Sequence, residues 1–559
     1  MKTPRLLPIL LAFCMFSTGA SGLVNEYVLA TITTYILGNS IEQFSIVIAS
    51  MMLMMGISGF VQSQMSDNNL IYKFIGVEVV MAVLGGFAPL AIYGAFAYFD
   101  YNFAVVHYFF VLSVGFLIGF EIPIVMRIIN QQNISLKTNL AIVYAMDYVG
   151  AFVGAIIWVK VLLKFYPLTE ISFIVAGFNF AIALITVTYF MFTGLIKHRV
   201  TTAIVMLMTV LILLTGYLNN RDISDLFEQR FYDDPIIHKT TTKYQHIVLT
   251  QNKQLGDIRL YINGNTQFSS LDEKRYHDLL VHPVMSIAHM PEHALILGGG
   301  DGLALRELLK YKKLKSITLV DLDPDMIKLA SENPHLTKLN KNAFQDARLH
   351  VSPPGNVNSV NAKGVYLESE DLLTKKIQSE WVATVDVYSI DADQFIRTKN
   401  GQRWDVVIID FPDPSSVELS KLYSKQFYRK LRTHLSNNAF VSIQSTSPYH
   451  AKESFLAIGN TLKSAGFNIL PYRQNIPSFG DWGFHLAWPS ASGGSEKEIK
   501  NNLKAIEKFS VDTDYVTPEL MLASFAFGKG ELTSKTHCVN TVMFPCLLTN
   551  YTNYGWRVD

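Results

Sequence analysis

The sequence is poor in cysteine and has no excess of either charge. Only three cysteines, Cys14, Cys538 and Cys546, occur among its 559 residues, which excludes a secreted module framed by disulfides. The 47 Lys and Arg residues are balanced by 46 Asp and Glu residues, for a formal net charge of +1. Without a basic face to neutralise phosphates, the chain is not predicted to bind nucleic acid. The second half contains no internal repeat and no low-complexity segment.

Charged residues are scarcest in the first 218 residues, which hold 9 basic and 8 acidic side chains. The apolar runs there offer about 20 residues each, the length that a helix needs to cross about 30 Å of hydrocarbon. The sequence therefore predicts a multi-pass transmembrane domain over residues 1–218, an α-helical bundle of about seven spans in a cell (inner) membrane. The predicted spans are Leu6–Ile36, Phe44–Val61, Ile75–Phe96, Val105–Val125, Leu140–Leu162, Ile171–Phe192 and Thr202–Leu218.

The orientation of these spans is ambiguous. With seven alternating spans, most basic residues fall on the side of Lys2 and Arg5, and only Lys160 and Lys164 fall on the other. The positive-inside rule then puts the N-terminus in the cytoplasm and the second half of the chain outside it. Two alternative interpretations of the first run change the number of spans. The first run is either a cleavable signal peptide or, with Gly19–Gly22 in its middle, a hairpin or re-entrant segment.

Several acidic residues lie in or near the apolar spans, where charge is costly and usually faces the bundle interior or a cavity. They either guide a cationic substrate or make structural pairs with residues such as Arg127. The residues concerned are Glu26, Glu78, Glu121 and Asp147. Gly150 and Gly154 form a GxxxG pattern beside Asp147, which favours close helix packing.

The second half of the chain begins with a predicted polar connector at 219–242. Two strand-like runs follow, His246–Thr250 and Asp257–Tyr261, closed by an Asn263-Gly264 turn signal. This pattern predicts a small β-hairpin or β-sheet subdomain over residues 243–290.

From residue 291 to 490, strands alternate with helical patterns, which is typical of a doubly wound α/β domain. Several of the predicted apolar strands end next to acidic residues or a glycine-rich turn, the residue types that bind ligands in such domains. The strands are predicted at 294–297, 316–323, 406–410 and 440–445. Residues 352–380, which contain Pro, Gly and Asn, are predicted to be a surface insertion, and 491–559 a C-terminal extension.

The first of these strands leads into the turn GGGDG (298–302). Glycines such as Gly298 and Gly300 let the backbone approach a ligand closely, and Asp321, 20 residues after Asp301, is placed to bind a ribose hydroxyl pair. Asp301 lies where a dinucleotide site would meet a pyrophosphate. Since a carboxylate repels phosphate but suits a cation, the turn argues against NAD and for an adenosyl sulfonium.

Further carboxylates follow other strands, at the edge where α/β sheets place their ligands. Asp391, Asp410 and Asp413 converge on one crevice and predict a polycationic substrate. Asp393 and Asp405, by contrast, are interpreted as cap or turn residues.

Taken together, these motifs resemble the spermidine synthase (polyamine aminopropyltransferase) family, of the bacterial type with an N-terminal multi-pass membrane domain. The resemblance runs from about Tyr244 to Trp488 and, more loosely, to the C-terminus, and it also covers part of the membrane half. Its motifs are YQ (244–245), DEKRYHDLLVHP (272–283), GGGDGLALRE (298–307), DLD (321–323) and DFPDP (410–414), with FEIP (120–123) and DYVGAFVGA (147–155) before them.

This resemblance implies a Rossmann-like, methyltransferase-type fold, an aminopropyl transfer to a diamine and a role for each matching residue. Asp410 is the expected catalytic acid–base residue. The donor, decarboxylated S-adenosylmethionine, is expected to contact Gln245, Gly298, Gly300, Asp321, Asp391 and Ala392. The polyamine is expected to contact Tyr276, His277, Asp301, Asp410 and Asp413.

The resemblance implies no metal and no cofactor beyond this cosubstrate. The expected partners are the diamine, most often putrescine in this family, the adenosyl sulfonium, the lipid bilayer and a second copy of the chain in a homodimer. Because the donor is made in the cytoplasm, the catalytic half is expected there, against the charge count. Cys538 and Cys546 either pair in an oxidising compartment or remain two buried thiols.

Three departures from the family pattern concern the acceptor more than the reaction. The sequence after Asp413 lacks a Gly-Pro, Phe479 stands where a Tyr is frequent, and 352–380 is a predicted insertion. In addition, Ala392 stands where this family usually has a Gly. Two other functions stay open at this point. One is an S-adenosylmethionine-dependent methyltransferase, and the other is a polyamine transporter or sensor with a non-catalytic binding domain.

Overall fold

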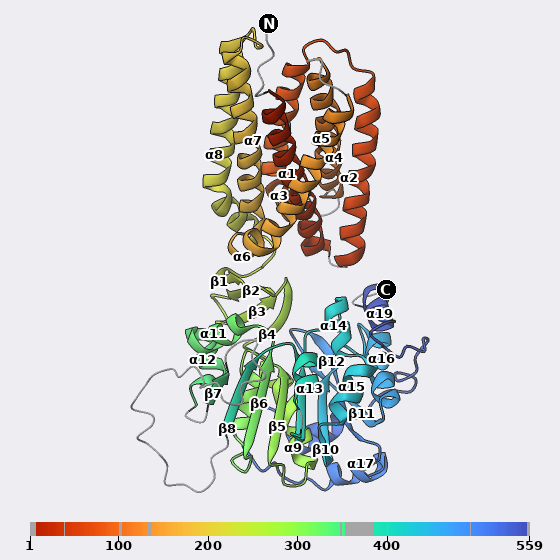
Figure 1. Cartoon of the computed structure of the whole chain (residues 1–559). Coiled ribbons are helices and arrows are strands. Elements are labelled where there is room, and N and C mark those ends of the chain that lie inside the picture. The colour runs from red at the N-terminus through yellow and green to blue at the C-terminus, as the bar shows by residue number, and fades with distance from the viewer. Residues whose placement is uncertain are drawn as a thin grey trace. The chain divides into compact units, whose positions relative to one another are not determined.

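The computed structural model describes residues 7–37, 40–99, 103–131, 136–346, 349–352, 384–399, 401–491 and 494–555. The expected insertion at 352–380 lies outside these residues except for Ser352. The chain forms two compact units, Met1–Asp233 and Asp234–Asp559 (Figure 1).

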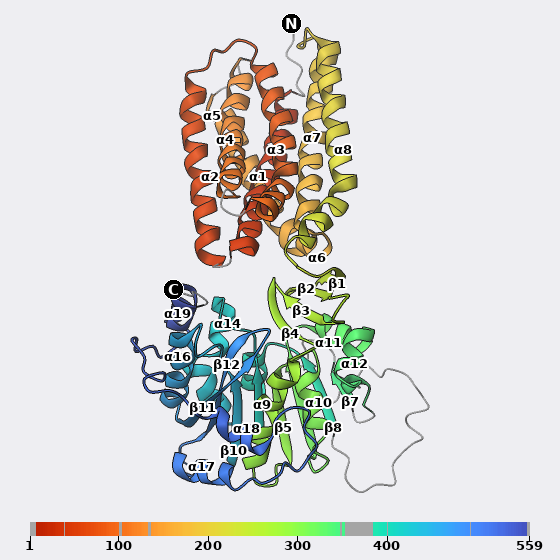
Figure 2. The same ribbon diagram turned by 180° about the vertical axis from the view of Figure 1, so that it is seen from behind.

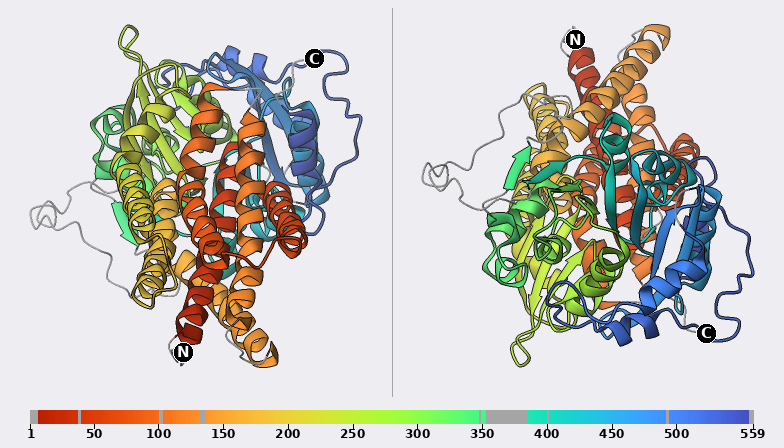
Figure 3. Two further views of the ribbon diagram at one scale, coloured as in Figure 1. Left: turned by 90° about the horizontal axis from the view of Figure 1, so that it is seen from above. Right: turned by 90° about the horizontal axis from the view of Figure 1, so that it is seen from below.

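The first unit is helical, and its helices run alongside one another in one bundle (Figure 3). Among the described residues, seven helices are long and apolar enough to cross a membrane. The bounds are α1 Leu7–Leu37, α2 Ser40–Ser63, α3 Leu70–Tyr98, α4 Phe103–Asn130, α5 Leu136–Ile157, a π-helical turn Trp158–Leu162, α6 Leu163–Phe165, α7 Leu168–Phe192 and α8 Arg199–Gln229. The run expected as a possible hairpin is the single helix α1, continuous through Gly19–Gly22.

Small residues let α1 and α5 approach closely. A Cβ on Gly150 would lie 2.0 Å from the carbonyl oxygen of Phe16, and one on Gly154 would lie 2.7 Å from that of Ala20. The GxxxG pattern therefore serves backbone-to-backbone packing, the role expected of small residues between apolar helices.

The polar residues of the bundle are bonded to one another. Asn179 Nδ2 donates to Glu78 Oε2 over 2.9 Å, and Ser17 Oγ donates to Asn179 Oδ1 over 3.3 Å. Arg127, considered above as a partner for the intramembrane acids, instead pairs with Asp67. Glu78 and Glu121 each retain a buried oxygen without a hydrogen-bond partner among the described residues.

The second unit starts with a four-stranded antiparallel sheet in the order β1-β2-β3-β4. Its strands are β1 Ile236–Thr241, β2 His246–Gln251, β3 Ile258–Ile262 and β4 Asn265–Ser269. The turn signal Asn263-Gly264 joins β3 to β4, both residues having positive φ (50° and 80°) as a tight hairpin requires.

The segment 219–242, predicted to be a polar connector, contains the boundary between the two units, at Asp233 and Asp234, but it is not without secondary structure. It contains the end of α8 and the strand β1. The helix continues to Gln229 because Ile223 and Phe227, four residues apart, keep one apolar face while the rest turns polar. Strand β1 was missed because its sequence, IIHKTT, does not alternate regularly and is only partly buried.

The main sheet has eight strands in the order β11-β12-β10-β9-β5-β6-β8-β7. From β10 to β7 in this order, each strand pairs in parallel with the next, whereas β12 runs antiparallel to both of its neighbours, β10 and β11. The bounds are β5 His293–Gly298, β6 Ser316–Asp321, β7 Leu349–Ser352, β8 Thr384–Ser389, β9 Trp404–Asp410, β10 Leu435–Gln444, β11 Phe467–Ile476 and β12 Gly480–Pro489. The strands predicted from sequence match β5, β6, β9 and β10 to within a few residues.

Helices cover both faces of this sheet (Figure 2). They are α9 Glu273–Ile287, α10 Leu303–Leu309, α11 Pro324–Glu332, α12 Pro334–Leu339, a 3-10 turn Ala343–Gln345, α13 Ala392–Thr398, α14 Val417–Leu422, α15 Lys425–Arg432, α16 Lys452–Ser464, α17 Glu496–Lys504, α18 Pro518–Ser524 and α19 Cys546–Tyr554. The doubly wound α/β prediction is confirmed in this unit.

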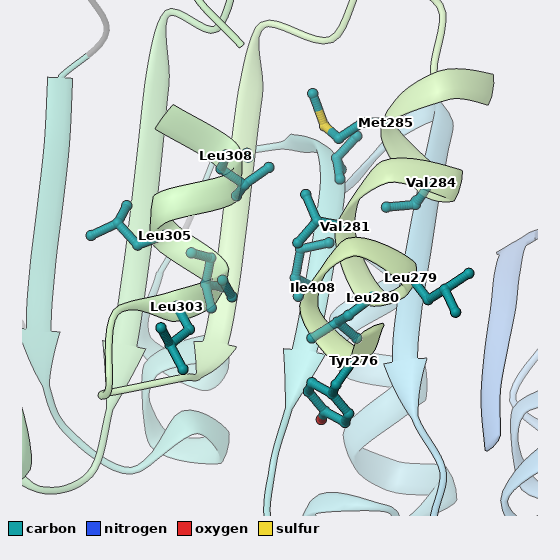
Figure 4. Close-up of a cluster of buried hydrophobic side chains, with 14 of the residues drawn as sticks. Tyr276, Leu279, Leu280, Val281, Val284, Met285, Leu303, Leu305, Leu308 and Ile408 are labelled. Atoms are coloured by element: carbon teal, nitrogen blue, oxygen red, sulfur yellow. The ribbon is translucent and has the colours of Figure 1, made fainter. Parts of the chain in front are cut away.

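Two hydrophobic cores result from the alternation along each strand. In β9, Val406 and Ile408 join the core that includes α9 and α10, whereas Val407 and Ile409 join the core that includes α13, α15 and α16. Figure 4 shows part of the first core, with Tyr276 of α9 at the end of the cluster where the neighbouring strand arrows end. The cores thus fix α9 against the sheet, with Tyr276 at its carboxyl edge.

Candidate active site

The carboxyl ends of three neighbouring strands bring the predicted acidic residues together. Gly298, the last residue of β5, is paired in register with Asp410, the last of β9. Asp321 ends β6 on the other side of β5 and pairs with Ser389 of β8. Since ligands of open α/β sheets bind beyond this edge, the predicted site residues occupy the expected place.

The glycine turn fits between these carboxylates only without side chains. Gly298 has φ +86°, and a Cβ there would lie 2.1 Å from the carbonyl oxygen of Asp410. Gly300 donates its N–H to Asp321 Oδ2 over 3.0 Å, and its Cβ would lie 2.7 Å from the same oxygen. The turn therefore holds Asp321 in place.

Asp410 is oriented by a side chain from α9. Tyr276 donates its hydroxyl to Asp410 Oδ1 over 2.5 Å, and the other oxygen, Oδ2, lies 3.4 Å from the position of a Cβ on Gly299. Phe479, noted above as a departure from the family pattern, packs edge-on against the ring of Tyr276. It thus supports the tyrosine that orients Asp410.

A buried ion-pair chain supplies positive charge beside the acids. His277 Nδ1 lies 3.0 Å from Glu273 Oε2, and Arg306 donates to both carboxylate oxygens of Glu273 over 2.9 Å. Burial disfavours the charged imidazole. The hydrogen bond and charge of Glu273, with the charges of Asp301 and Asp410, outweigh that effect and raise the pKa of His277 to about 9. The ring is therefore cationic at neutral pH.

Burial and the charge of His277 shift the pKa values of Asp410 and Asp301 in opposite directions. Burial raises the pKa of Asp410 to about 6, against the lowering effect of the His277 charge, while Asp301 adds to the rise. Burial also raises the pKa of Asp301, again opposed by His277. A carboxyl group with a pKa near 6 is suited to exchanging protons near neutral pH.

Asp321 and Gln245, both expected to contact the donor, lie near each other. Burial raises the pKa of Asp321 to about 6, against the effect of the N–H donors of Asp323 and Gly300. Thr242 donates its hydroxyl to Asp323 Oδ2 over 2.7 Å and accepts from the backbone N–H of Gln245. The turn that carries Gln245 is thereby attached to the end of β6, two residues from Asp321.

Asp391 and Ala392 follow β8, the next strand beyond β6. Asp391 Oδ1 accepts from the backbone N–H of Gln394 over 2.8 Å and so caps α13. Ala392 is buried in that helix's first turn. Asp405, interpreted as a cap or turn residue, bonds the backbone N–H groups of Glu292 and His293.

Asp413 follows β9 in the same loop as Asp410, and two residues that sequence reasoning missed hold it. Gln444 Nε2 donates to Oδ1 over 3.1 Å, and Thr446 Oγ1 donates to Oδ2 over 2.9 Å. Thr446 has φ +58°, a costly conformation for a β-branched residue. The only local signal is their place at the end of strand β10, where Gln444 is the last residue and Thr446 follows two residues later.

A second cluster of titratable groups, Asp278, His282 and Glu307, lies apart from the strand ends and has ligand atoms within 4.8 Å of one another. Arg306 and Lys310 already bond the carboxylate of Glu307, over 2.7 and 2.6 Å. This cluster is therefore an ion-pair network that joins α9 to α10.

A doubly wound sheet with a glycine turn after its first strand, and an acid ending the next, defines a Rossmann-like, methyltransferase-type domain. Residues 273–367 and 375–501 match the model of the spermine/spermidine synthase domain. The polyamine aminopropyltransferase of Oceanobacillus iheyensis is 34% identical over 95% of this chain and 94% of its own length. Polyamine aminopropyltransferase 2 of Ralstonia nicotianae is 36% identical over 86% and 87%, and polyamine aminopropyltransferase 2 of Aquifex aeolicus is 33% identical over 97% and 98%.

The chain belongs to the polyamine aminopropyltransferase family and is a transferase enzyme. Among solved structures, it is similar to a spermidine synthase in complex with the transition-state analogue AdoDATO, at 22% identity and a TM-score of 0.41, over 53% of this chain and 87% of that one. The family resemblance read from the motifs is confirmed.

Proposed function

We propose that the enzyme transfers an aminopropyl group from decarboxylated S-adenosylmethionine to a diamine, with putrescine as the acceptor and spermidine and methylthioadenosine as products. The observation that carries the proposal is the pair of half-buried carboxylates at the sheet edge: Asp301 inside the glycine turn, and Asp410 held by Tyr276 beside that turn. This edge is acidic where a nucleotide site would be basic, which suits a sulfonium and an amine.

The reaction follows from this arrangement. A neutral amine nitrogen of the diamine attacks the methylene carbon bonded to the sulfonium. The C–N bond forms as the C–S bond breaks, and the bonding pair goes to sulfur, giving neutral methylthioadenosine. The surplus proton on nitrogen passes to Asp410. Since the leaving group is neutral, the proposed step needs no metal or resident cofactor.

The remaining predicted residues have binding roles in this proposal. Asp321 and the turn of Gln245 hold the nucleoside with Gly298 and Gly300, and the loop of Asp391 and Ala392 contacts the adenine. Tyr276, His277, Asp301 and Asp413 surround the amines. Holding nitrogen in line with the C–S bond supplies the remaining rate enhancement.

Product analysis of the full chain purified in detergent tests the function. The protein receives decarboxylated S-adenosylmethionine or S-adenosylmethionine with a panel of diamines, and mass spectrometry identifies the products. Methylthioadenosine together with spermidine from putrescine is expected. S-adenosylhomocysteine would instead identify a methyltransferase, and binding of polyamine without consumption of either donor would identify a transporter or sensor.

The proposal includes insertion of the seven helices into a membrane and association with a second copy of the chain. Light scattering in detergent measures the mass of the protein and so tests the association.

The cytoplasmic expectation for the catalytic unit rests on the origin of the donor. Two observations favour the opposite face: α1 is one continuous helix, which keeps the number of spans odd, and Cys538 and Cys546 form a disulfide. Alkaline phosphatase and green fluorescent protein fused to the C-terminus distinguish the two. We expect an active phosphatase fusion, because alkaline phosphatase folds only outside the cytoplasm. A fluorescent fusion would instead place the catalytic unit in the cytoplasm.

A further inference from the structure

The C-terminal extension reaches the loop that carries Asp410 and Asp413. Tyr551, on helix α19, donates its hydroxyl to Asp413 Oδ2 over 2.9 Å, although 138 residues separate the two in sequence. Helix α19 lies beyond the residues that match the family domain, which end at 501. A side chain from outside that domain is therefore bonded to a predicted acceptor-site carboxylate.

Helix α19 is fixed to the catalytic unit rather than loosely attached. The disulfide Cys538–Cys546 closes a short loop immediately before it, and Leu547 in its first turn is fully buried in the core shared with α15 and α16. Both half-cystines belong to the same core. Figures 1 and 2 both show α19 beside α14 and α16.

Inside the disulfide loop, Asn540 ties the extension to three elements. Its Nδ2 donates to the carbonyl oxygen of Ser420 over 2.7 Å, its carbonyl oxygen accepts from the N–H of Lys425 over 2.8 Å, and its N–H donates to Thr461 Oγ1 over 2.9 Å. Asn540 is fully buried. The position of Tyr551 is thus set by a rigid support.

The contact with Asp413 completes a set of donors from different parts of the chain. Tyr551 and Thr446 both donate to Oδ2, and Gln444 donates to Oδ1. Hydrogen bonds to an ionised carboxylate are strong and directional. Loss of the Tyr551 bond removes one donor from Oδ2 and so loosens the orientation of Asp413. Asp410, by contrast, is held by a different residue, Tyr276.

We propose that Tyr551 is a positioning residue for the amine acceptor: through Asp413 it fixes the carboxylate that receives the distal ammonium of the diamine, and the disulfide-closed extension holds it there. The proposal rests on the proposed aminopropyl transfer. A fixed carboxylate favours diamines of one length, so the contact governs the KM for the acceptor and the discrimination between diamines, with little effect on kcat or on the donor.

The variant Tyr551→Phe tests this, with Tyr554→Phe as the matched control because Tyr554 lies on the same helix and is 56% exposed. Steady-state kinetics of the full chain in detergent measure putrescine, diaminopropane and cadaverine as acceptors. For Tyr551→Phe we expect the KM for the preferred diamine to rise about tenfold, the loss of one hydrogen bond to a charged group. The differences in kcat/KM among putrescine, diaminopropane and cadaverine should become smaller. The kcat and the KM for the donor should stay within about twofold of the wild-type values. Unchanged acceptor KM, or an equal change in Tyr554→Phe, would overturn the proposal.

A double-mutant cycle establishes whether Tyr551 acts through Asp413. Adding Tyr551→Phe to Asp413→Asn should cost much less than in the wild-type background, since the two share one interaction. Full additivity would contradict the proposal. If the wild-type protein transfers no aminopropyl group to any diamine, the proposed function fails; if it does and Tyr551→Phe behaves as wild type, only this inference fails.

The disulfide provides a second, independent measurement. Reduction with dithiothreitol, or the Cys538→Ser/Cys546→Ser variant, should raise the KM for the acceptor in the wild-type background. In Tyr551→Phe the same change should raise this KM little further, because the bond that the disulfide supports is already lost. An equal rise in both backgrounds would show that the loop acts on the site without Tyr551, which overturns the proposed support.

Discussion

Tyr276 donates its hydroxyl to Asp410 Oδ1 over 2.5 Å, although one residue lies on helix α9 and the other ends strand β9. The bond fixes the carboxylate so that its second oxygen faces the glycine turn, 3.4 Å from the position of a Cβ on Gly299. In the proposed reaction, that oxygen receives the proton of the attacking amine. Because Tyr276 is packed in the core that contains α9 and α10, this core sets the orientation of the proposed base, Asp410.

Replacing Asp410 by Asn should abolish most turnover while leaving donor binding intact. The amide cannot accept the proton, so kcat should fall at least about 100-fold, the scale of general base catalysis. Release of methylthioadenosine measures kcat, and calorimetry measures donor affinity. Asp405→Asn is the matched control, since Asp405 lies near the start of the same strand but accepts hydrogen bonds from the backbone N–H groups of Glu292 and His293. Wild-type turnover in Asp410→Asn would refute the assigned role.

The pH dependence should report the charge of His277. Asp410 must be ionised to act as a base, so kcat/KM should fall as the pH drops through about 6. The His277 cation lowers the pKa of Asp410. His277→Gln removes that charge, so the pKa of Asp410 rises and the acid limb moves to higher pH, by about one pH unit.

The diamine supplies the internal control for this experiment. A free alkylamine has a pKa of about 10, and this second limb of the profile belongs to the substrate. It should stay in place in His277→Gln. An acid limb that does not move, or that moves to lower pH, would show that His277 does not act on Asp410 electrostatically.

The strand ends could be predicted from sequence because each apolar run stops at an acid or at the glycine turn. Gly298, Asp321 and Asp410 close β5, β6 and β9, and parallel strands bring such ends to one edge. Chain order was therefore enough to predict that the acids meet.

Contacts between distant segments could not be predicted in the same way. Gln444 and Thr446 reach Asp413 only through the pairing of β10 with β9, and Tyr551 only through the fold of the extension. No local pattern marks them, since the alternation of apolar residues reports burial and not which polar side chains meet. The helical end of α8 within the predicted connector could not be predicted for a related reason, since composition does not distinguish a solvated helix from a loop.

Gly300→Ala should weaken donor binding specifically. The added Cβ would lie 2.7 Å from Asp321 Oδ2, and Asp321 is held by the N–H groups of Gly300 and Asp323, so the carboxylate must be displaced. We expect the donor KM to rise about tenfold or more, as for a lost charged hydrogen bond, with the acceptor KM nearly unchanged. Kinetics with each substrate varied in turn separate the two constants. An equal rise in both would mean that the turn collapses rather than that Asp321 moves.

Gly150→Leu should destabilise the helical unit, because the Cβ of any side chain at this position would lie 2.0 Å from the carbonyl oxygen of Phe16. The α1–α5 interface would have to separate, an overpacking cost of about 1–3 kcal/mol, which corresponds to a fall in Tm of roughly 2–10 °C. Gly59→Leu on α2 is the control, because a Cβ at Gly59 meets no atom within 4 Å. Thermal unfolding in detergent, followed by circular dichroism, compares the two variants with the wild type. Equal Tm values for Gly150→Leu and Gly59→Leu would show that α1 and α5 do not need this close approach, and the GxxxG pattern would then have no packing role in the bundle.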